Sequence, residues 1–482
     1  KIDDIDMSEA FSLVDKEASI KEAEKIRIKS LPREEKKRIS QEKKLEKERL
    51  KSIYGKAKID GIEVEVANWL VEPPGIFMGR GLHPLRGRWK PRITAKDVIL
   101  NLDEDASVPE GPWKAVVHDH NSTWLASWIE NLTGKRKYVW LHDSSYLRQD
   151  NDKAKYDTAK KLENYIFDIE KEIVKQMSHT KDTTKRKVAT VCYLIYKLAM
   201  RVGDEKDPDE ADTIGASTLR VEHLKFPVIN DKIQIEFNFL GKDSVPWQKT
   251  LDISSPDTRA LYENLLFYMK GKDRTDEIFE DITSAKVNIF LRSLDKANLP
   301  NLTAKVFRTY IATAIVKKHL SAPILKLNKN ESEFKKIYVA KIANLQAAIT
   351  CNHKKGIDPK NPASKKSWEK FEQSVTNKKE KIKQIKLELK EKMWKTEIQK
   401  FKKEQRLEKL EFQLRLQQET KDYNLGTSLR NYIDPRVFKS WCDYVNLDWT
   451  KIYTSTLQRK FKWIEQYSKS DLKKYVNIDN TR

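Results

Sequence analysis

Five side chains, far apart in the sequence, form a set that could attack a phosphodiester without a metal ion. They are one tyrosine, two arginines, a lysine and a histidine: Tyr432, Arg201, Arg308, Lys242 and His353. A phenol can act as the nucleophile, guanidinium and imidazole groups can bind phosphate oxygens, and an ammonium can protonate the leaving oxygen. A tyrosine ahead of an apolar helix is usually a core or surface residue, so Tyr432 is a candidate only in combination with the other four.

The sequence around each of these residues is more specific than its type. The five segments read Met-Arg-Val-Gly-Asp-Glu-Lys (200–206), Phe-Leu-Gly-Lys-Asp-Ser (239–244), Ala-Lys-Val-Phe-Arg-Thr-Tyr (304–310), Cys-Asn-His (351–353) and Asn-Tyr-Ile-Asp-Pro-Arg (431–436). In residue identities, order and spacing, these segments resemble those of the eukaryotic type IB DNA topoisomerases. The similarity extends from about residue 71 to the C-terminus.

The resemblance implies a reaction and a role for each residue. Tyr432 is the expected nucleophile, Lys242 the general acid, and Arg201, Arg308 and His353 the groups that bind the nonbridging oxygens. Enzymes of this family nick one strand of duplex DNA through a 3′-phosphotyrosine, allow supercoils to relax by rotation and religate, with no ATP or metal cofactor. We therefore expect double-stranded DNA as the partner, a monomer clamped around it, and a nuclear location in chromatin and the nucleolus, in replication and transcription.

A loop at residues 72–81, Glu-Pro-Pro-Gly-Ile-Phe-Met-Gly-Arg-Gly, predicts further DNA contacts. Its glycines permit a close backbone approach, and the arginine between them can reach a phosphate or a base edge. By resemblance, the expected DNA-binding residues are Gly79, Arg80, Gly81, Lys90, Asp243, Thr427 and Asn431, and a camptothecin-type inhibitor would contact Phe77, Arg80, Asp243 and Asn431. Met78 stands where the family pattern would have arginine.

The composition points to a polyanionic partner. The chain has 482 residues, and its formal net charge is 94 − 72 = +22, so phosphate neutralisation and counterion release would supply much of the affinity for nucleic acid. The three cysteines are widely spaced, which favours neither a disulfide framework nor a zinc site. The sequence contains no apolar run long enough to span a bilayer and no secretory signal. Because it begins with Lys1, we expect an N-terminally truncated fragment.

We predict a multidomain α+β protein, since the chain is too long for one ordinary core. The resemblance adds a mainly helical catalytic domain related to the tyrosine recombinases. The expected divisions are an upper lobe that is helical to about residue 58 and then rich in β-structure (1–147), the catalytic domain (148–355), a coiled-coil linker (356–424) and a small helical domain that carries the tyrosine (425–482).

Periodicity predicts the elements that would position the candidate residues. Nearly continuous apolar sequence at 188–200 predicts a buried helix, with Gly203 as its stop. Alternation at 233–239 predicts a strand, which a turn bearing Lys242 joins to a second strand. Two further helices, at 303–320 and 341–353, would carry Arg308 and His353, and short runs at 123–129 and 138–141 predict a small sheet.

Two charged regions predict long helices. Residues 8–51 are rich in Lys, Glu and Arg and are divided by Pro32. Residues 365–423 contain neither Gly nor Pro and have apolar residues at heptad-like intervals, which favours an antiparallel coiled coil with a turn near 390–396. A contact with DNA and a purely mechanical spacer are equally good interpretations of this second region.

Alternatives to a topoisomerase remain open from the sequence. A tyrosine recombinase uses an equivalent set of residues but needs specific sites and a synaptic tetramer, and a non-catalytic basic scaffold would need none of the five. The long predicted coiled coil and the residue identities of the five motifs favour the topoisomerase. His118 and His120 lack a suitable ligand cluster, so we expect surface or phosphate contacts there and no metal site.

Overall fold

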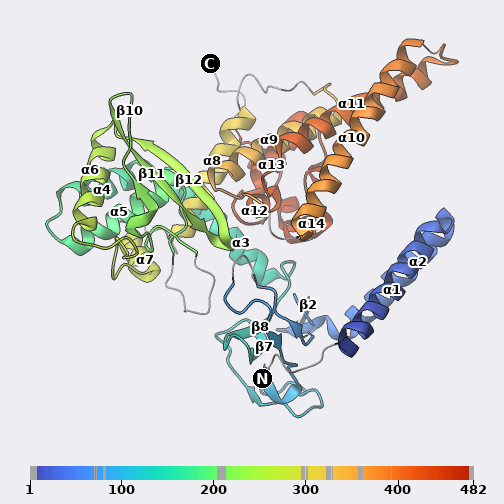
Figure 1. Ribbon diagram of the computed structural model, residues 1–482, viewed down its shortest axis with the longest axis horizontal. Helices are drawn as coiled ribbons and strands as arrows, with labels where there is room; N and C mark the ends of the chain where they lie inside the picture. The colour runs from blue at the N-terminus through green and yellow to red at the C-terminus, as the bar shows by residue number, and fades with distance from the viewer. Residues whose placement is uncertain are drawn as a thin grey trace. The chain divides into compact units, whose positions relative to one another are not determined.

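The computed structural model describes residues 8–476, apart from 70, 72, 80–82, 204–212, 295–298, 300–301, 322–326, 328, 356–361 and 392 (Figure 1). The chain forms two compact units, and each is described by itself. The smaller unit comprises Lys1–Glu72, Ile93–Ile129 and Arg136–His142, and the larger unit comprises Pro73–Arg92, Glu130–Lys135 and Asp143–Arg482.

The smaller unit begins with two exposed helices, α1 (Ser8–Ser30) and α2 (Arg33–Tyr54), which Pro32 separates as predicted. A hairpin of β1 (Lys56–Ile59) and β2 (Ile62–Glu65) follows α2. Its second sheet has the strand order β6-β5-β7-β8, where β6 (Ala115–Val117) is parallel to β5 (Val98–Asn101) and the other pairs are antiparallel. Strands β7 (Trp124–Ile129) and β8 (Arg136–Trp140) confirm the sheet predicted from their aromatic and branched residues.

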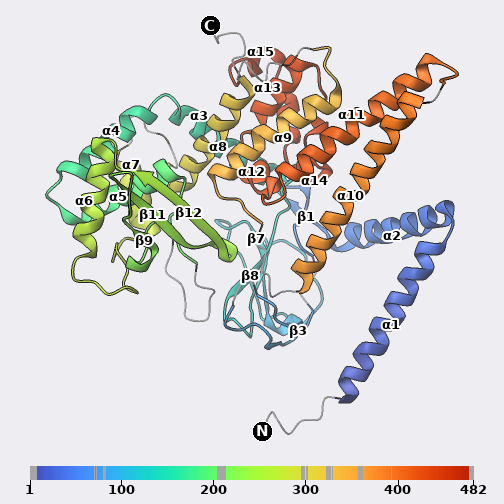
Figure 2. The same cartoon turned by 45° about the horizontal axis from the view of Figure 1, so that its top comes forward.

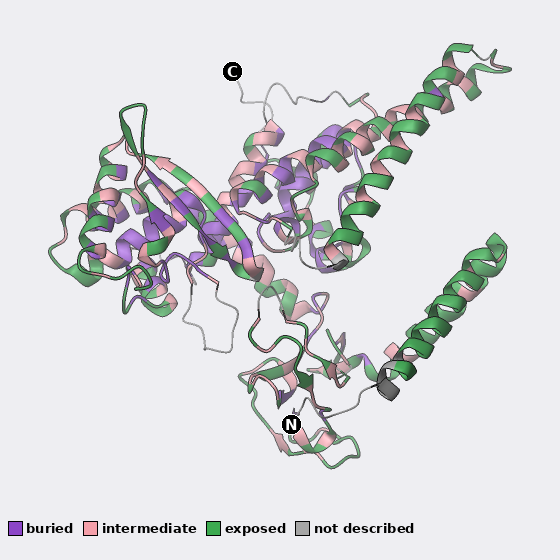
Figure 3. Cartoon of the chain, in the orientation of Figure 1, coloured by how far each residue is buried: buried purple, intermediate pink, exposed green. Residues whose placement is uncertain are grey.

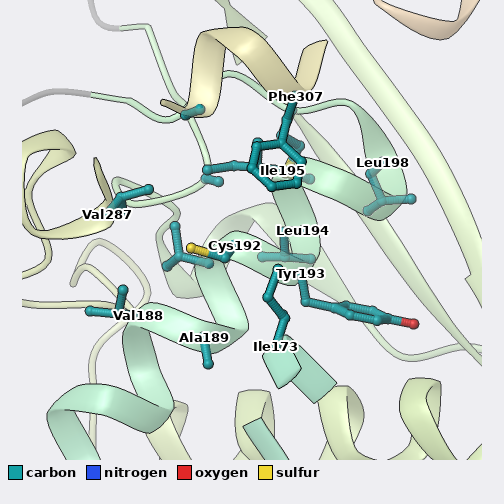
Figure 4. Close-up of a cluster of buried hydrophobic side chains, with 14 of the residues drawn as sticks. Ile173, Val188, Ala189, Cys192, Tyr193, Leu194, Ile195, Leu198, Val287 and Phe307 are labelled. Carbon is teal, nitrogen blue, oxygen red and sulfur yellow. The ribbon is translucent and has the colours of Figure 1, made fainter. Parts of the chain in front are cut away.

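The first hydrophobic core of the larger unit is mainly helical. Helices α3 (Tyr146–Leu162), α4 (Ile166–His179), α5 (Thr183–Leu198), α6 (Pro256–Met269) and α7 (Ser284–Ser293) surround it. Nine residues of α5 are buried, and Figure 4 shows its side chains packed with Ile173, Val287 and Phe307. A sheet of β9 (Leu224–Lys225), β10 (Val228–Ile229), β11 (Lys232–Gly241) and β12 (Val245–Asp252) adds Phe237 and Trp247 to the same core. The predicted strand at 233–239 is thus confirmed.

The end of α5 corrects one prediction from the sequence. Ala199 adopts the left-handed conformation with φ of 52° and ends the helix, so Gly203 is not its stop. Gly203, with φ of 91°, instead lies against Gly215, where an added Cβ on Gly215 would come within 2.3 Å of the Gly203 Cα. Gly203 and Gly215 are therefore needed for the close approach of their two backbone segments. Helix α5 is capped at Ala199, four residues before Gly203.

A second core joins the C-terminal helices to α8 (Ala304–Ser321) and α9 (Glu333–Thr350). These helices are α12 (Leu425–Asn431), α13 (Pro435–Val445), α14 (Ser455–Lys460) and α15 (Lys469–Leu472). Figure 3 shows buried residues concentrated in this part of the chain, and one apolar cluster contains residues of α8, α9 and α13. Helix α8 confirms the prediction for 303–320, whereas α9 begins earlier than the predicted 341 because Ser332 caps it.

Between α9 and α12 the chain forms a long helical hairpin of α10 (Pro362–Glu391) and α11 (Glu397–Glu419), side by side in Figures 1 and 2. The helices run antiparallel, because Lys386 pairs with Glu411 and Lys403 pairs with Glu388. The turn lies within the predicted 390–396. A two-stranded sheet of β3 (Gly75–Ile76) and β4 (Trp89–Lys90) completes the larger unit.

Arg436 is a charged residue buried beside the second core. Its guanidinium is bonded to Asp434 and Asp157, with the shortest N–O distances 2.8 and 2.6 Å, and its side chain is 1% exposed. We expect Arg436→Met to lower the free energy of unfolding by about 3–5 kcal/mol, since it leaves the buried Asp434 carboxylate unpaired. Arg415→Met, which removes an exposed pair with Glu419, should cost about 0–1 kcal/mol. Denaturant titration followed by tryptophan fluorescence measures both, and equal losses would contradict the prediction.

Candidate active site

Tyr432 lies in the short connection between α12 and α13, with 6% of its surface exposed. Pro435 at the first position of α13 and Asp434 as its cap begin that helix directly after the tyrosine. Thr313 on α8 holds this connection on both sides. Its hydroxyl donates to the Tyr432 carbonyl at 3.2 Å and accepts the Asp434 amide at 3.1 Å, so the backbone around the phenol is fixed to α8.

Two salt-bridged side chains hold the end of α12 that precedes the tyrosine. Lys155 on α3 donates to the Asn431 carbonyl at 3.2 Å. Arg430 pairs with the buried Asp143 at 2.5 Å. Burial raises the pKa of Asp143, but the charge of Lys460 and the charge and hydrogen bond of Arg430 together outweigh it and lower the pKa to about 2. The carboxylate is therefore ionised at neutral pH and keeps its hold on α12.

Helix α9 and the residues that follow it hold the start of α12. The Asn424 amide donates to the His353 carbonyl at 2.7 Å. Asn344 donates to the Leu425 carbonyl at 3.1 Å and accepts the Ser428 hydroxyl at 2.8 Å. These bonds couple the position of the tyrosine segment to that of the histidine.

Both candidate arginines reach Tyr432. Arg201 donates from Nη1 to the phenol oxygen at 3.0 Å. Arg308 is 3% exposed, and its Cζ lies 4.9 Å from the centroid of the tyrosine ring. Its Nη2 donates to the Cys351 carbonyl at 3.0 Å, which ties α8 to the end of α9. Two cations therefore face one phenol.

His353 stacks on the same ring. The two ring centroids are 5.2 Å apart, and the ring planes differ by 29°. The histidine follows the end of α9 at Thr350, where Asn352 adopts a φ of 53° and the His353 amide donates to the Ala348 carbonyl. This left-handed residue turns the chain at the helix end and directs the imidazole toward Tyr432.

Lys242 is at the tip of the hairpin between β11 and β12, as predicted, and is exposed. A cleft brings it together with the arginines. This cleft is lined by Arg201, Lys242 and Arg308, together with Gly241, Trp247 and Asn352. The structure thus collects all five candidate residues around one cleft and the buried phenol beside it.

The charges of the site change the protonation of both rings. Burial raises the pKa of Tyr432, but the cations Arg308 and Arg201 and the hydrogen bond from Arg201 outweigh it, so that the pKa falls below the ordinary 10.0. Burial first, and then the same two cations, lower the pKa of His353 to about 3. At neutral pH the imidazole is therefore uncharged, and the phenol is easier to ionise than an ordinary tyrosine.

Several buried nitrogen atoms of the site have no hydrogen-bond partner in the part of the chain that the structure describes. They are Nε and Nη1 of Arg308 and both ring nitrogens of His353. Buried polar atoms in folded proteins are nearly always bonded. Their position beside Tyr432 suits a ligand with several oxygen atoms and negative charge, and a phosphodiester has both.

The other predicted DNA contacts lie in several parts of the chain. Thr427 and Asn431 lie on α12, the helix that leads to Tyr432, and both are partly buried. Arg80 and Gly81 lie outside the described residues. The backbone of Asp243 follows Lys242 at the hairpin tip, whereas its side chain is outside the description.

Phe77, Gly79 and Lys90 do not line the cleft. Phe77 packs edge-on against His83 with the ring centroids 4.9 Å apart. Gly79 has a φ of 57°, and an added Cβ would come within 2.5 Å of His83. Lys90 forms an ion pair of 2.9 Å with Glu130, and the two side chains are 13% and 2% exposed. Lys90 was expected to contact DNA, and in the structure its ammonium has a buried carboxylate as partner.

Sequence reasoning missed the residues that hold the site together. Lys155, Lys249 and Thr313 all donate to backbone carbonyl groups. A carbonyl acceptor has no signature in the sequence, because every residue carries one. A lysine that bonds to it resembles any other lysine of a basic chain.

The described ranges offer neither a metal site nor a membrane span. There, no group of three or more His, Cys, Asp or Glu side chains could hold a metal ion. His118 bonds to the Leu102 carbonyl through Nδ1, and His120 is exposed. Among the same residues, no helix has the length and apolar character that a membrane span requires.

Three family models match consecutive parts of the chain. Residues 144–389 match the catalytic core of eukaryotic DNA topoisomerase I, residues 1–141 match the DNA binding fragment of the same family, and residues 404–474 match the C-terminal topoisomerase domain. The catalytic-core model includes four of the five candidate residues, and the C-terminal model includes Tyr432.

Several curated proteins are similar over most of this chain. DNA topoisomerase 1 of Caenorhabditis elegans is 37% identical over 474 residues, which are 95% of this chain and 56% of the relative. DNA topoisomerase 1 beta of Arabidopsis thaliana is 35% identical and matches 89% of this chain over 47% of its own length. DNA topoisomerase I, mitochondrial, of Homo sapiens is 34% identical over 90% of this chain and 73% of its own length.

The chain spans about half the length of the first two of these relatives. The family models nevertheless follow one another along nearly all of it, and the mixed α+β structure is consistent with them. On these matches, the chain belongs to the eukaryotic DNA topoisomerase I family.

Proposed function

We propose that this chain relaxes supercoiled duplex DNA as a type IB topoisomerase, without ATP. It nicks one strand, holds the cut end as a 3′-phosphotyrosine on Tyr432, allows rotation about the intact strand and religates. The observation that carries the proposal is the 3.0 Å hydrogen bond from Arg201 to the Tyr432 phenol, beside the unpartnered buried nitrogens of Arg308 and His353. Membership of the family supports the same conclusion.

The cleavage step exchanges one phosphodiester for another. The Tyr432 oxygen bonds to phosphorus, the bond from phosphorus to the 5′ oxygen breaks, the phenol proton passes to water or to a neighbouring group, and Lys242 protonates the 5′ oxygen. The lowered pKa of Tyr432 supports this assignment, because the phenolate is the stronger nucleophile. The free energy of the broken bond is retained in the new one, so the 5′ hydroxyl can reverse the step without ATP.

The cations and the neutral imidazole bind the charge that develops on the phosphate. Arg308 has two nitrogens available in a buried site, and a guanidinium fork matches the spacing of two nonbridging oxygens. His353 donates from whichever ring nitrogen carries its proton. Preorganised donors of this kind contribute most where water is excluded, and both residues are buried.

DNA binding rests mainly on the phosphate backbone. The net charge of +22 favours counterion release, and backbone contacts carry little sequence preference. We assign Thr427 and Asn431 to DNA near the tyrosine, and we keep Gly79, Arg80, Gly81, Lys90 and Asp243 as contacts proposed from the resemblance. A camptothecin-type inhibitor would meet Phe77, Arg80, Asp243 and Asn431.

The remaining proposals follow from family membership. The catalytic domain is related to the tyrosine recombinases, the hairpin α10–α11 is a coiled-coil linker, and one copy of the chain closes around DNA. Nuclear location also follows from the family as a whole, although one human relative is named mitochondrial. Imaging of the full-length tagged protein decides between these locations.

Tyr432→Phe tests the nucleophile. We expect no plasmid relaxation and no DNA-linked protein after denaturant quenching, because the phenyl ring lacks the attacking oxygen, whereas DNA affinity should change little. The parent should relax a plasmid that has no special site in EDTA and without nucleotide. Tyr444→Phe, a change at an exposed tyrosine of α13, is the matched control and should behave as the parent. A Tyr432→Phe variant that relaxes DNA at the parental rate would overturn the proposal.

Arg308→Lys tests whether the paired donors of the Arg308 guanidinium bind two nonbridging phosphate oxygens. This change keeps a positive charge but loses the paired donors, so we expect the single-turnover rate of cleavage to fall about 10²-fold or more. Arg415→Lys on the exposed face of α11 is the control for a simple exchange of cations. Cleavage by the Arg308→Lys variant within a factor of three of the parent would show that Arg308 does not bind the reacting phosphate.

The titration of His353 tests its proposed role as a neutral donor. Because its pKa is lowered to about 3, the His353 imidazole signal in NMR spectra of the free protein should not shift between pH 8 and 5. The pKa of His353 is lower in the folded protein than its value of 6.5 in the unfolded chain. The unfolded chain therefore binds a proton more readily, so the free energy of unfolding is highest above pH 6.5 and decreases as the pH falls from 6.5 toward 3. His353→Asn should therefore flatten this part of the stability profile. An imidazole that titrates near pH 6.5 would contradict the assignment.

A further inference from the structure

Lys249, in the middle of β12, bonds to two helix ends at once. Its Nζ donates to the Leu198 carbonyl at 2.8 Å and to the Thr350 carbonyl at 3.0 Å. Leu198 is the last residue of α5, and Thr350 is the last residue of α9. The side chain is partly buried, and its ammonium lies 5.4 Å from the centroid of the Trp247 ring. One lysine thus joins two helices and a sheet.

An ammonium suits this place for two physical reasons. The last four carbonyl groups of an α-helix have no partner within the helix, and its C-terminus carries partial negative charge. A cation placed between two such ends satisfies one carbonyl of each and interacts favourably with both dipoles. Burial, with a smaller effect of Arg308, lowers the pKa of Lys249 to about 8 against the opposing effect of Cys351. The lowered pKa is the expected sign of an ammonium withdrawn from bulk water.

The two helix ends lead directly to catalytic candidates. Arg201 lies three residues after Leu198, and His353 lies three residues after Thr350. Lys242 precedes β12 on the same hairpin, where Phe237 of β11 is the cross-strand partner of Lys249. The segments that carry three of the five candidate residues are therefore joined at this one ammonium.

A second bond extends the connection to α8. The carbonyl that follows Thr350, that of Cys351, accepts the hydrogen bond from Arg308. A displacement of the end of α9 would therefore move the acceptor that orients this arginine. Reaction rates are sensitive to such displacements, since a misplacement of about 1 Å can cost about 10²-fold.

We propose that Lys249 is a positioning residue for DNA cleavage, which holds the ends of α5 and α9 so that Arg201, Arg308 and His353 converge on Tyr432. This inference rests on the proposed function. Lys249 acts through backbone carbonyl groups and does not bind the reacting phosphate. Contact with DNA phosphate is the competing role, and it predicts a different kinetic result.

The test compares Lys249→Met with Lys341→Met. Methionine keeps most of the apolar stem but has no donor and no charge. Lys341 is a matched control, because it is a partly buried lysine in the body of α9 whose pKa burial also lowers. The substrate is an oligonucleotide duplex with a nick beside the cleavage position, so that each enzyme cuts once and cannot religate. The readouts are the cleavage rate at saturating DNA, the Kd for this duplex and the thermal midpoint.

For Lys249→Met we expect the cleavage rate at saturating DNA to fall at least 10-fold, with the Kd within twofold of the parent. Lys341→Met should leave both unchanged. Lys249→Arg keeps the charge and several donors, so it should recover most of the rate and also provides a folded variant if methionine is not tolerated. A weaker Kd with an unchanged rate at saturation would assign Lys249 to DNA contact and overturn the proposal, as would parental rates in both Lys249 variants.

A double-mutant cycle separates positioning from a general loss of stability. If Lys249 acts partly through His353, then Lys249→Met should slow cleavage less in a His353→Asn background than in the parent. Fully additive effects would contradict positioning through the histidine. Failure of the proposed function itself would look different, because the parent would then form no DNA-linked protein at all.

Discussion

The site depends on a buried phenol held against two guanidinium groups. Removal of Tyr432 from water disfavours its ionised form, and the nearby charges of Arg308 and Arg201, with the hydrogen bond from Arg201, reverse that effect. Burial lowers the pKa of His353, and the same two charges lower it further, so one buried, positively charged site prepares both rings for different roles. Two like charges so close together repel, and they stay in place because the protein supplies acceptors such as the Cys351 carbonyl.

Helix ends provide most of these acceptors and the turns that carry the reactive side chains. Helices α5, α9 and α12 all end at the site, and Arg201, His353 and Tyr432 follow these ends within a few residues. Unpaired carbonyl groups at a helix C-terminus attract cations and hydrogen-bond donors. The site therefore uses groups that the helices leave unsatisfied, and lysine and arginine side chains bind them.

The elements around the site could largely be predicted from the sequence, because each depends on local pattern. The apolar run of α5, the alternation of β11 and the uninterrupted hairpin α10–α11 are signals of this kind. The convergence of the five residues was accessible only through resemblance to a family, since no local pattern encodes a contact between residues 201 and 432. The stop of α5 at Ala199 depended on tertiary packing, and there the local signal at Gly203 was misleading. The ion pair of Lys90 with Glu130 also depends on tertiary packing, and no local pattern reports it.

The base of the helical hairpin explains how a distant tyrosine meets the rest of the site. Residues on either side of the hairpin pair directly, with Lys354 opposite Tyr423 and the Lys355 amide bonded to the Asp422 carbonyl at 2.8 Å. The Asn424 amide bonds to His353 itself. The register between the histidine and the tyrosine segment is thus set where the hairpin leaves and rejoins the core. Because loop-closure entropy grows only slowly with length, α10 and α11 can be long and exposed without loosening the alignment of Tyr432.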